Sequence, residues 1–138
     1  MAITLPPDYK PTDKEEFMNP LQIEYFRKRL LDWRDQLLKE STGTISTLRE
    51  HTSSAADAAD RASVESDRAL ELRTRDRARK LINKINDALR RIEDGSYGYC
   101  EVTAEPIGVR RLEARPIATL SIEAQELHER TERQYRGD

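Results

Sequence analysis

Two long segments of this 138-residue chain carry apolar residues at alternating intervals of three and four, and small polar residues separate them. This spacing is that of one face of an α-helix at the coiled-coil period. The face consists of Ile23, Phe26, Leu30, Trp33 and Leu37 in the first segment and of Ala78, Leu81, Ile85, Ala88 and Ile92 in the second. Two helices joined by a short turn run antiparallel. The sequence therefore predicts a long antiparallel coiled-coil hairpin.

Local signals predict where these helices begin and end. Asn19 followed by Pro20 is a strong helix start, with Asn at the N-cap and Pro at the first helical position. The first helix is expected to run to about Glu50. Residues 51–60 are expected to form the turn because they are small and polar. Gly95 is expected to end the second helix, since glycine is common just after a helix C-terminus.

The chain is expected to have three parts. Residues 1–32 form an N-terminal arm and a helical segment of a small globular base, and residues 33–93 form the coiled-coil arm, with its tip near 51–62. Residues 94–138 form a loop that looks like a degenerate zinc ribbon, followed by a C-terminal helix. Gly43 lies in the first long helix, where a glycine is either tolerated or acts as a hinge.

The composition supports a mainly α fold with a narrow core. Hydrophobic and charged residues each make up 36% of the chain, and the formal net charge is -2. This balance argues against direct binding to DNA or to a membrane surface. One cysteine cannot form an internal disulfide, and no apolar run has the length of a signal peptide or a membrane span. We therefore expect a cytoplasmic protein.

The loop has the frame of a zinc ribbon but only one of its ligands. Cys100 stands where a C-x-x-C pair would begin, and the other three positions are occupied by Thr103, Ser121 and Ala124. Structural zinc sites use four ligands, almost always Cys and His, and His128 lies outside the motif. No bound zinc is therefore expected, and Ser121 is expected to cap the last helix.

The tip of the hairpin carries two carboxylates, Asp57 and Asp60, three residues apart. They either cap the second helix and complement its dipole, or are carried by the long arm into a deep site on a partner. An enzyme active site is not expected, because a hairpin tip cannot enclose a pocket. The chain also lacks a phosphate-binding glycine loop, a Ser–His–Asp pattern and a metalloprotease helix.

Basic residues gather on the second helix and in the loop that follows it. Arg77, Lys80 and Lys84 share one helical face, and Arg110, Arg111 and Arg115 lie in the loop. They form either a solvated, salt-bridged surface or a surface that binds phosphate, for which arginine offers bidentate geometry.

Five stretches in order carry a resemblance to a known family. They are FMNPLQIEYFRKRLLDWRDQL, DAADRA, LELRTRDRARKLINKI, YGYCE and IGVRRLEARP, within about Phe17 to His128. With this order and spacing, the chain resembles the DksA/TraR family of bacterial transcription factors. The resemblance implies a monomer that binds RNA polymerase at its secondary channel and rim helices and destabilises open promoter complexes. It also implies joint action with ppGpp in the stringent response, with ribosomal RNA promoters repressed and some amino-acid biosynthesis promoters activated.

The resemblance also assigns roles to residues. The tip that contacts the polymerase corresponds to Asp57, Asp60 and Ala62, and the site for ppGpp at the polymerase rim corresponds to Arg77, Leu81, Lys84, Arg115 and Gln125. A basic residue is common in the family where Gln125 stands. Members typically hold a four-cysteine zinc site, of which only Cys100 remains here, so the chain is interpreted as a zinc-free member.

Two other functions remain open at this point. One is a factor of the Gre type, which enters the same channel and stimulates transcript cleavage. The other is a structural coiled-coil adaptor, in which DxxDRA would be no more than a helix cap. Cleavage of a stalled elongation complex would identify the first, and the absence of binding to core polymerase would identify the second.

Overall fold

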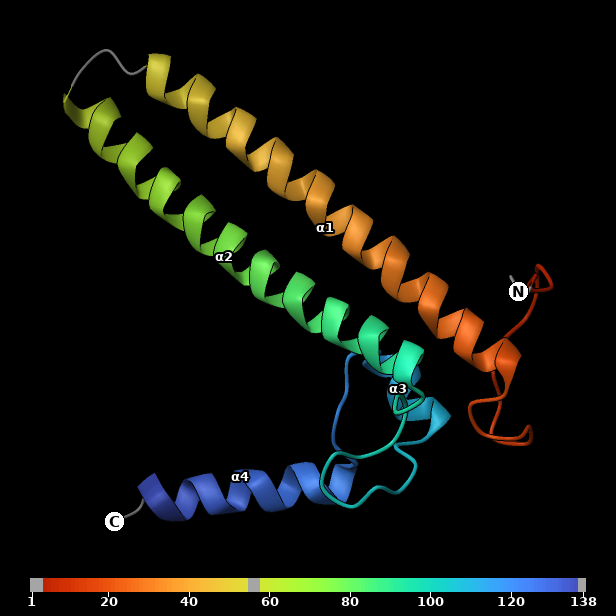
Figure 1. Cartoon of the computed structure of the whole chain (residues 1–138). Helices are drawn as coiled ribbons and strands as arrows, with labels where there is room; N and C mark the ends of the chain where they lie inside the picture. Colours follow the sequence, from red (N-terminus) through yellow and green to blue (C-terminus); the bar gives the residue numbers. More distant parts are fainter. Residues whose placement is uncertain (1–3, 55–57, 137–138) are drawn as a thin grey trace. The chain divides into compact units, whose positions relative to one another are not determined.

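The structure, a computed structural model, describes residues 4–54 and 58–136, with side chains described outside 42–61 and 136. In this part of the chain the fold is mainly helical, with four helices in the order α1 (Pro20–Ser54), α2 (Ala58–Asp94), α3 (Val109–Ala114) and α4 (Ile122–Arg136) (Figure 1). The chain divides into two compact units, Leu31–Asn86 and the combination of Met1–Leu30 with Asp87–Asp138. No helix of the described residues is long and apolar enough to cross a membrane.

Capping side chains and glycine place the helix ends where the sequence predicts them. The Asn19 side-chain oxygen accepts a hydrogen bond of 3.0 Å from the Gln22 backbone N–H, so Asn19 is the N-cap of α1. At the end of α2, Gly95 has a φ of 85°. The Ser96 N–H donates to the carbonyl of Arg91 at 3.0 Å, as in a Schellman motif. Both boundary predictions are confirmed.

The turn between the long helices is shorter than predicted. Residues 51–54 belong to α1 and 58–60 to α2, so the prediction of a turn over 51–60 is wrong at both ends. Residues 55–57 lie outside the described part of the chain. Alanine and serine are compatible with a helix, and extending an existing helix costs far less than nucleating one. The backbone of α1 is also helical through Gly43.

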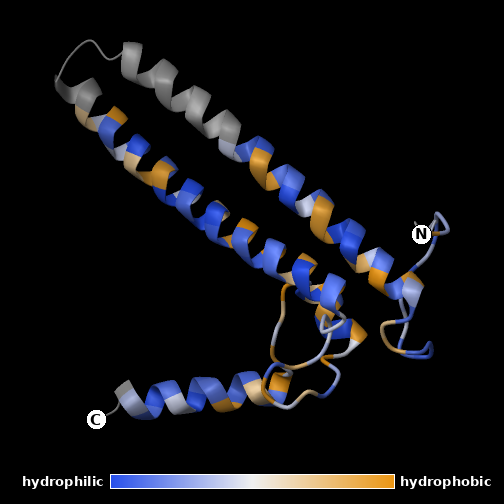
Figure 2. Cartoon of the chain, in the orientation of Figure 1, coloured by the Kyte–Doolittle hydropathy of each residue, from blue (hydrophilic) through white to orange (hydrophobic). Residues whose placement is uncertain are grey.

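The unit Leu31–Asn86 is an antiparallel helical hairpin, in which α1 and α2 run side by side (Figure 1). Arg34 Nη1 donates a hydrogen bond of 2.7 Å to Asn86 Oδ1 and so joins the two helices. Leu37 and Ile85 are 8% and 0% exposed, in agreement with the predicted apolar faces. Outside the segments drawn in grey, most residues of α1 and α2 are hydrophilic, and hydrophobic residues are interspersed along each helix (Figure 2).

The second unit, here called the base, combines residues 1–30 with 87–138. Its largest fully buried side chains are Phe26, Leu30, Leu112 and Gln22. The base also contains α3, in a segment that was predicted to be loop. This helix has no side-chain cap at Gly108, and burial of Val109 and Leu112 holds it in place. Six residues without a capping signal are too few to show helical periodicity, so α3 was missed.

Gln22 fixes the N-terminal residues on the base. Its side-chain oxygen accepts a hydrogen bond of 2.8 Å from the Met18 N–H, and its side-chain nitrogen donates to the Thr12 carbonyl at 3.2 Å. The same nitrogen donates to Glu15 at 3.3 Å, and the Tyr9 hydroxyl donates to Glu15 at 2.6 Å. A fully buried amide is therefore satisfied on both sides.

Candidate functional site

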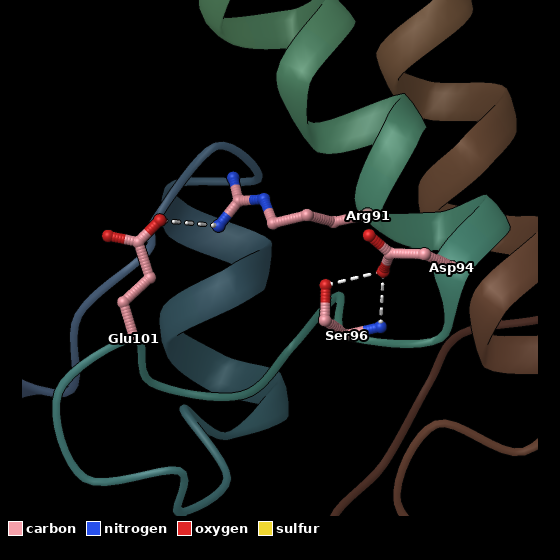
Figure 3. A network of polar contacts seen from close by, with 4 residues as sticks. All are labelled: Arg91, Asp94, Ser96 and Glu101. Atoms are coloured by element: carbon pink, nitrogen blue, oxygen red, sulfur yellow. Dashed lines mark hydrogen bonds and ion pairs between the residues drawn. The ribbon is translucent and has the colours of Figure 1, made fainter.

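The first part of the site is the turn that leads from α2 into the ribbon-like loop (Figure 3). Asp94 accepts hydrogen bonds from the Ser96 backbone N–H at 2.9 Å and from the Ser96 hydroxyl at 2.6 Å. These bonds lower the pKa of the Asp94 carboxyl below its usual value. Arg91 Nη1 lies 3.7 Å from Glu101 Oε1 and links the end of α2 to the loop. Together these contacts fix the direction in which the loop leaves the helix.

Cys100, Thr103, Ser121 and Ala124, here called the four ribbon positions, come together in the base. Cys100, Ser121 and Ala124 are 3%, 6% and 6% exposed, and Thr103 is exposed. The Ser121 hydroxyl oxygen accepts a hydrogen bond of 3.2 Å from the Ala124 N–H, so Ser121 caps α4 as predicted. The segments are joined next to Cys100, where the Glu101 N–H donates to the Thr119 carbonyl at 2.9 Å.

The sulfur of Cys100 is the centre of this arrangement. Burial acts to raise the pKa of the thiol, but hydrogen bonds donated to the sulfur lower it from 9.0 to about 6. The donors are the Thr103 side chain and the backbone N–H groups of Ser121, Thr103 and Val102. Each donor favours the charged form of the sulfur. One atom therefore receives hydrogen bonds from both segments that carry the ribbon positions.

The tip lies at the edge of the described part of the chain. Asp57 is outside the described residues, and for Asp60 the structure gives the backbone alone, in the first turn of α2. Ala62 is exposed. The helical start of α2 at Ala58 places the Asp60 backbone where an acidic residue complements the helix dipole.

Arg77, Leu81 and Lys84 lie on α2 within the hairpin unit. Arg77 and Lys84 are exposed, and Leu81 is half-buried. Neither Arg77 nor Lys84 forms an ion pair with a side chain that the structure describes, whereas the nearby Arg79 pairs with Asp76 at 3.2 Å. The charges of Arg77 and Lys84 are therefore available to an anionic partner.

Arg115 and Gln125 belong to the base. Arg115 is the exposed C-cap residue of α3, and its N–H donates to the Arg111 carbonyl at 2.8 Å. Gln125 is half-buried in the first turn of α4, where its N–H donates to the Ser121 carbonyl at 2.9 Å and its side chain to Glu129 at 3.2 Å. Arg110 and Arg111 were predicted in the loop but lie on α3, and Arg110 Nε is 3.4 Å from the Asp13 carboxylate.

Comparison with known proteins decides the family. Residues 22–92 match the family described as "DnaK suppressor protein DksA, N-terminal domain", and residues 95–130 match "Prokaryotic dksA/traR C4-type zinc finger". The chain belongs to the DksA family. The RNA polymerase-binding transcription factor DksA of Caulobacter vibrioides is 64% identical over 131 residues, which cover 95% of this chain and 92% of that protein.

Two further relatives agree with this assignment. DksA of Escherichia coli K12 is 43% identical over 137 residues, which cover 99% of this chain and 91% of that protein. The solved structure of transcription factor DksA2 from Pseudomonas aeruginosa superposes with a TM-score of 0.80 at 43% identity, covering 87% of this chain and 94% of that one. The predicted fold, a helical hairpin with a further C-terminal helix, is thus a DksA fold.

The C4-type zinc finger that defines this part of the DksA family does not fit the residues present here. Of the four ribbon positions only Cys100 offers a ligand of the preferred kind, and Ala124 offers no donor atom. The Ser121 hydroxyl oxygen already caps α4. Among the described residues, no group of three or more His, Cys, Asp or Glu could hold a metal ion. His128 pairs instead with Glu132 on α4, at 3.1 Å.

Several contacts that shape this DksA site were not predicted. The Tyr97 hydroxyl donates to the Pro116 carbonyl at 2.8 Å, next to Arg115, and Arg111 Nε donates to the Leu120 carbonyl at 2.8 Å, next to Ser121. Both acceptors are backbone carbonyls, which every residue carries, so no pattern of side chains could have shown them. One buried and one partly buried contact therefore hold the segments that carry Arg115 and the N-terminus of α4.

Proposed function

We propose that this protein binds RNA polymerase through the secondary channel and destabilises open promoter complexes. The observation that carries the proposal is the family assignment together with the hairpin: Leu31–Asn86 is a two-helix unit whose turn is flanked by DxxDRA. The relatives from Caulobacter and Escherichia coli are named RNA polymerase-binding transcription factors. The protein acts by binding rather than by catalysis.

The dimensions of the hairpin suit entry into a narrow channel. The part of α1 from Leu31 to Ser54 has 24 residues, and at about 1.5 Å per residue it extends for about 36 Å. Two packed helices can carry a small group deep into a partner while their flanks make the contacts that give affinity. In this proposal Asp57, Asp60 and Ala62 act near the catalytic region, where carboxylates compete for or perturb bound magnesium.

The second part of the proposal is joint action with ppGpp. Arg77 and Lys84 on α2 and Arg115 in the base are exposed cations, and guanidinium and ammonium groups form strong charge-assisted hydrogen bonds with phosphate. Leu81 supplies an apolar contact next to Lys84. Gln125 offers an uncharged amide where a basic side chain is common in the family. The negative charge of the ppGpp phosphates is therefore paired mainly with Lys84 and Arg115.

The third part is that the base functions without zinc. The support is the donor set described above, in which one thiol, two hydroxyl side chains and a methyl group occupy the four ribbon positions. The protein is further proposed to be a cytoplasmic monomer that does not bind specific DNA sequences. In the stringent response it would repress ribosomal RNA promoters and activate some amino-acid biosynthesis promoters. In this proposal residues 33–93 enter the secondary channel of the polymerase. Residues 1–32 and 94–138 form the part of the protein that remains outside the channel.

The alternatives of a Gre-type factor and a structural adaptor are not favoured, because the DksA family assignment covers both the hairpin and the base. The experiment is transcription in vitro from a ribosomal promoter, with and without ppGpp. We expect inhibition by the protein alone and stronger inhibition with ppGpp. Failure to bind core polymerase would refute the proposal, and cleavage of RNA in a stalled elongation complex would favour the Gre-type function.

A further inference from the structure

Arg115 is exposed, but the three residues that follow it are buried. Pro116 is buried, and Ile117 and Ala118 are 7% and 5% exposed. Backbone hydrogen bonds fix the turn: the Arg115 N–H donates to the Arg111 carbonyl at 2.8 Å, and the Ala118 N–H donates to the Arg115 carbonyl at 3.0 Å. The guanidinium of Arg115 therefore extends from a backbone that is held on both sides.

A tyrosine close to the end of α2 binds this turn from inside the base. The Tyr97 hydroxyl donates a hydrogen bond of 2.8 Å to the Pro116 carbonyl, across 19 positions of the chain. Tyr97 is 3% exposed, and the centre of its ring lies 5.9 Å from that of Phe26 on α1. Because burial raises the pKa of Tyr97, its hydroxyl stays protonated and remains a donor at neutral pH. The residue next to Arg115 is thus tied to the core of the base.

The end of α2 fixes Tyr97 in turn. The Tyr97 N–H donates to the Arg91 carbonyl at 3.1 Å, beside the contact that the Ser96 N–H makes with the same carbonyl. Asp94 accepts two hydrogen bonds from Ser96 in this turn (Figure 3). A short series of contacts therefore runs from the end of α2, through the Tyr97 hydroxyl, to the backbone next to Arg115.

We propose that Tyr97 is a positioning residue for Arg115 and so sets the sensitivity of the protein to ppGpp. The inference rests on the proposed function, in which Arg115 pairs with phosphate, and it adds a buried residue that touches no ligand. A guanidinium binds phosphate through hydrogen bonds of fixed geometry, so its direction affects affinity. Ordering a mobile segment on binding weakens affinity, and a backbone that is already fixed avoids this cost. Without the hydroxyl, the Pro116 carbonyl would lose this donor and the turn would be held less firmly.

The test is Tyr97→Phe, which removes the hydroxyl and keeps the ring against Phe26. Transcription from a ribosomal promoter is measured over a range of ppGpp concentrations, at equal occupancy of polymerase by each protein. We expect inhibition without ppGpp to equal that of the parent. The ppGpp concentration for the half-maximal effect should rise about threefold to tenfold, as for the loss of one hydrogen bond.

Tyr99→Phe is the matched control. It makes the same change two residues away, where the hydroxyl has no hydrogen-bond partner among the described residues, and it should leave the response to ppGpp unchanged. An unchanged half-maximal concentration in Tyr97→Phe would overturn the inference. Lower helix content of Tyr97→Phe by circular dichroism would also overturn it, since the hydroxyl would then serve the fold as a whole.

A double-mutant cycle separates positioning of Arg115 from other effects of the hydroxyl. In the Arg115→Ala background, Tyr97→Phe should have no further effect on the response to ppGpp, because the side chain that it positions is absent. If Tyr97→Phe weakens the response by the same factor in both backgrounds, the hydroxyl does not act through Arg115 and the inference is wrong.

Amide hydrogen exchange tests the positioning without ppGpp. In Tyr97→Phe, protection of the Arg115 and Ala118 N–H groups should fall about tenfold. The Gln125 N–H, which donates to the Ser121 carbonyl in α4, should keep its protection. Unchanged protection at Arg115 and Ala118 would contradict the inference. A parent that does not respond to ppGpp, with exchange altered as expected in the variant, would support the positioning of Arg115 and contradict the proposed function, so the two failures are distinguishable.

Discussion

The hydroxyl oxygen of Ser121 accepts a hydrogen bond of 3.2 Å from the backbone N–H of Ala124, and this contact begins α4 at a position that the family profile assigns to a zinc finger. A serine that caps a helix satisfies a backbone donor that would otherwise have no partner. Ser121 and Ala124, two of the four ribbon positions, are thus joined directly by this capping hydrogen bond.

Ser121→Ala should destabilise the base by about 1 kcal/mol, because the Ala124 N–H loses its acceptor. The measurement is urea unfolding followed by circular dichroism. Ser121→Thr is the matched control, since threonine keeps the hydroxyl oxygen that accepts from the Ala124 N–H and remains a favourable N-cap residue. Equal loss from both substitutions would show that the hydroxyl does not act as a cap.

Gln22→Leu should lower the free energy of unfolding by about 2–4 kcal/mol, because it leaves the Met18 N–H and the Thr12 carbonyl without their side-chain partner. The control is Gln36→Leu on the exposed surface of the same helix, for which the expected change is within about 0.5 kcal/mol. If Gln22→Leu is as mild as its control, the N-terminal residues are not held through this amide.

The contact between Tyr9 and Glu15 should depend on pH. The hydrogen bond donated by Tyr9 lowers the pKa of Glu15 from 4.5, and burial together with the same hydrogen bond raises the pKa of Tyr9 from 10.0 to about 12. A lowered carboxyl pKa contributes stability that is present above about 4.5 and is lost as pH falls through the folded value. A raised phenol pKa contributes stability that is present below 10.0 and is lost as pH rises through about 12.

The contact is therefore fully formed at intermediate pH. Tyr9→Phe removes the donor, so the pKa of Glu15 should rise, as followed by NMR titration of its side-chain carboxyl carbon. Tyr135→Phe, in an exposed residue of α4, is the control and should leave the Glu15 titration unchanged. An unchanged pKa of Glu15 in Tyr9→Phe would mean that the hydroxyl does not bind the carboxylate in solution.

Lys84→Ala or Arg115→Ala should weaken the response to ppGpp more than the activity without it. Each removes a charge-assisted contact with phosphate, of about 1.5–3 kcal/mol. Arg79→Ala is the control, because this exposed cation lies five residues from Lys84 and thus on another side of α2, and it pairs with Asp76. Equal loss with and without ppGpp would assign Lys84 and Arg115 to docking or folding.

The helix ends and the apolar faces were predictable because they depend on local side-chain signals. Asn19, Gly95 and Ser121 each act within a few residues, and the burial of Phe26 and Ile85 follows from helical periodicity. The extent of the turn was not predictable, because small polar residues permit a helix as well as a loop.

The hydrogen bonds that converge on Cys100 could not be predicted either. Their donors include backbone N–H groups of Val102, Thr103 and Ser121, and backbone groups carry no sequence signal. Sequence could show that three ligands of a zinc ribbon are absent. It could not show that the positions still meet around the remaining sulfur, because that depends on how residues 99–106 fold against the start of α4.

The central claim is that a carboxylate at the tip of the hairpin acts on the polymerase, whereas the flanks and the base provide affinity. Asp60→Asn removes one negative charge and keeps a residue that is acceptable near a helix start. Asp67→Asn is the matched control, because it makes the same change on an exposed residue of α2 about 10 Å further along the helix. Both variants should bind polymerase with nearly the affinity of the parent. Asp57→Asn should resemble Asp60→Asn but be milder.

The most direct measurement is the lifetime of the open complex at a ribosomal promoter, with each protein added at a concentration that gives the same occupancy of polymerase. We predict that the parent and Asp67→Asn shorten the lifetime equally and that Asp60→Asn leaves it close to the value for polymerase alone. A lifetime with Asp60→Asn as short as that with the parent would contradict the account, because the carboxylate would then serve only the start of α2.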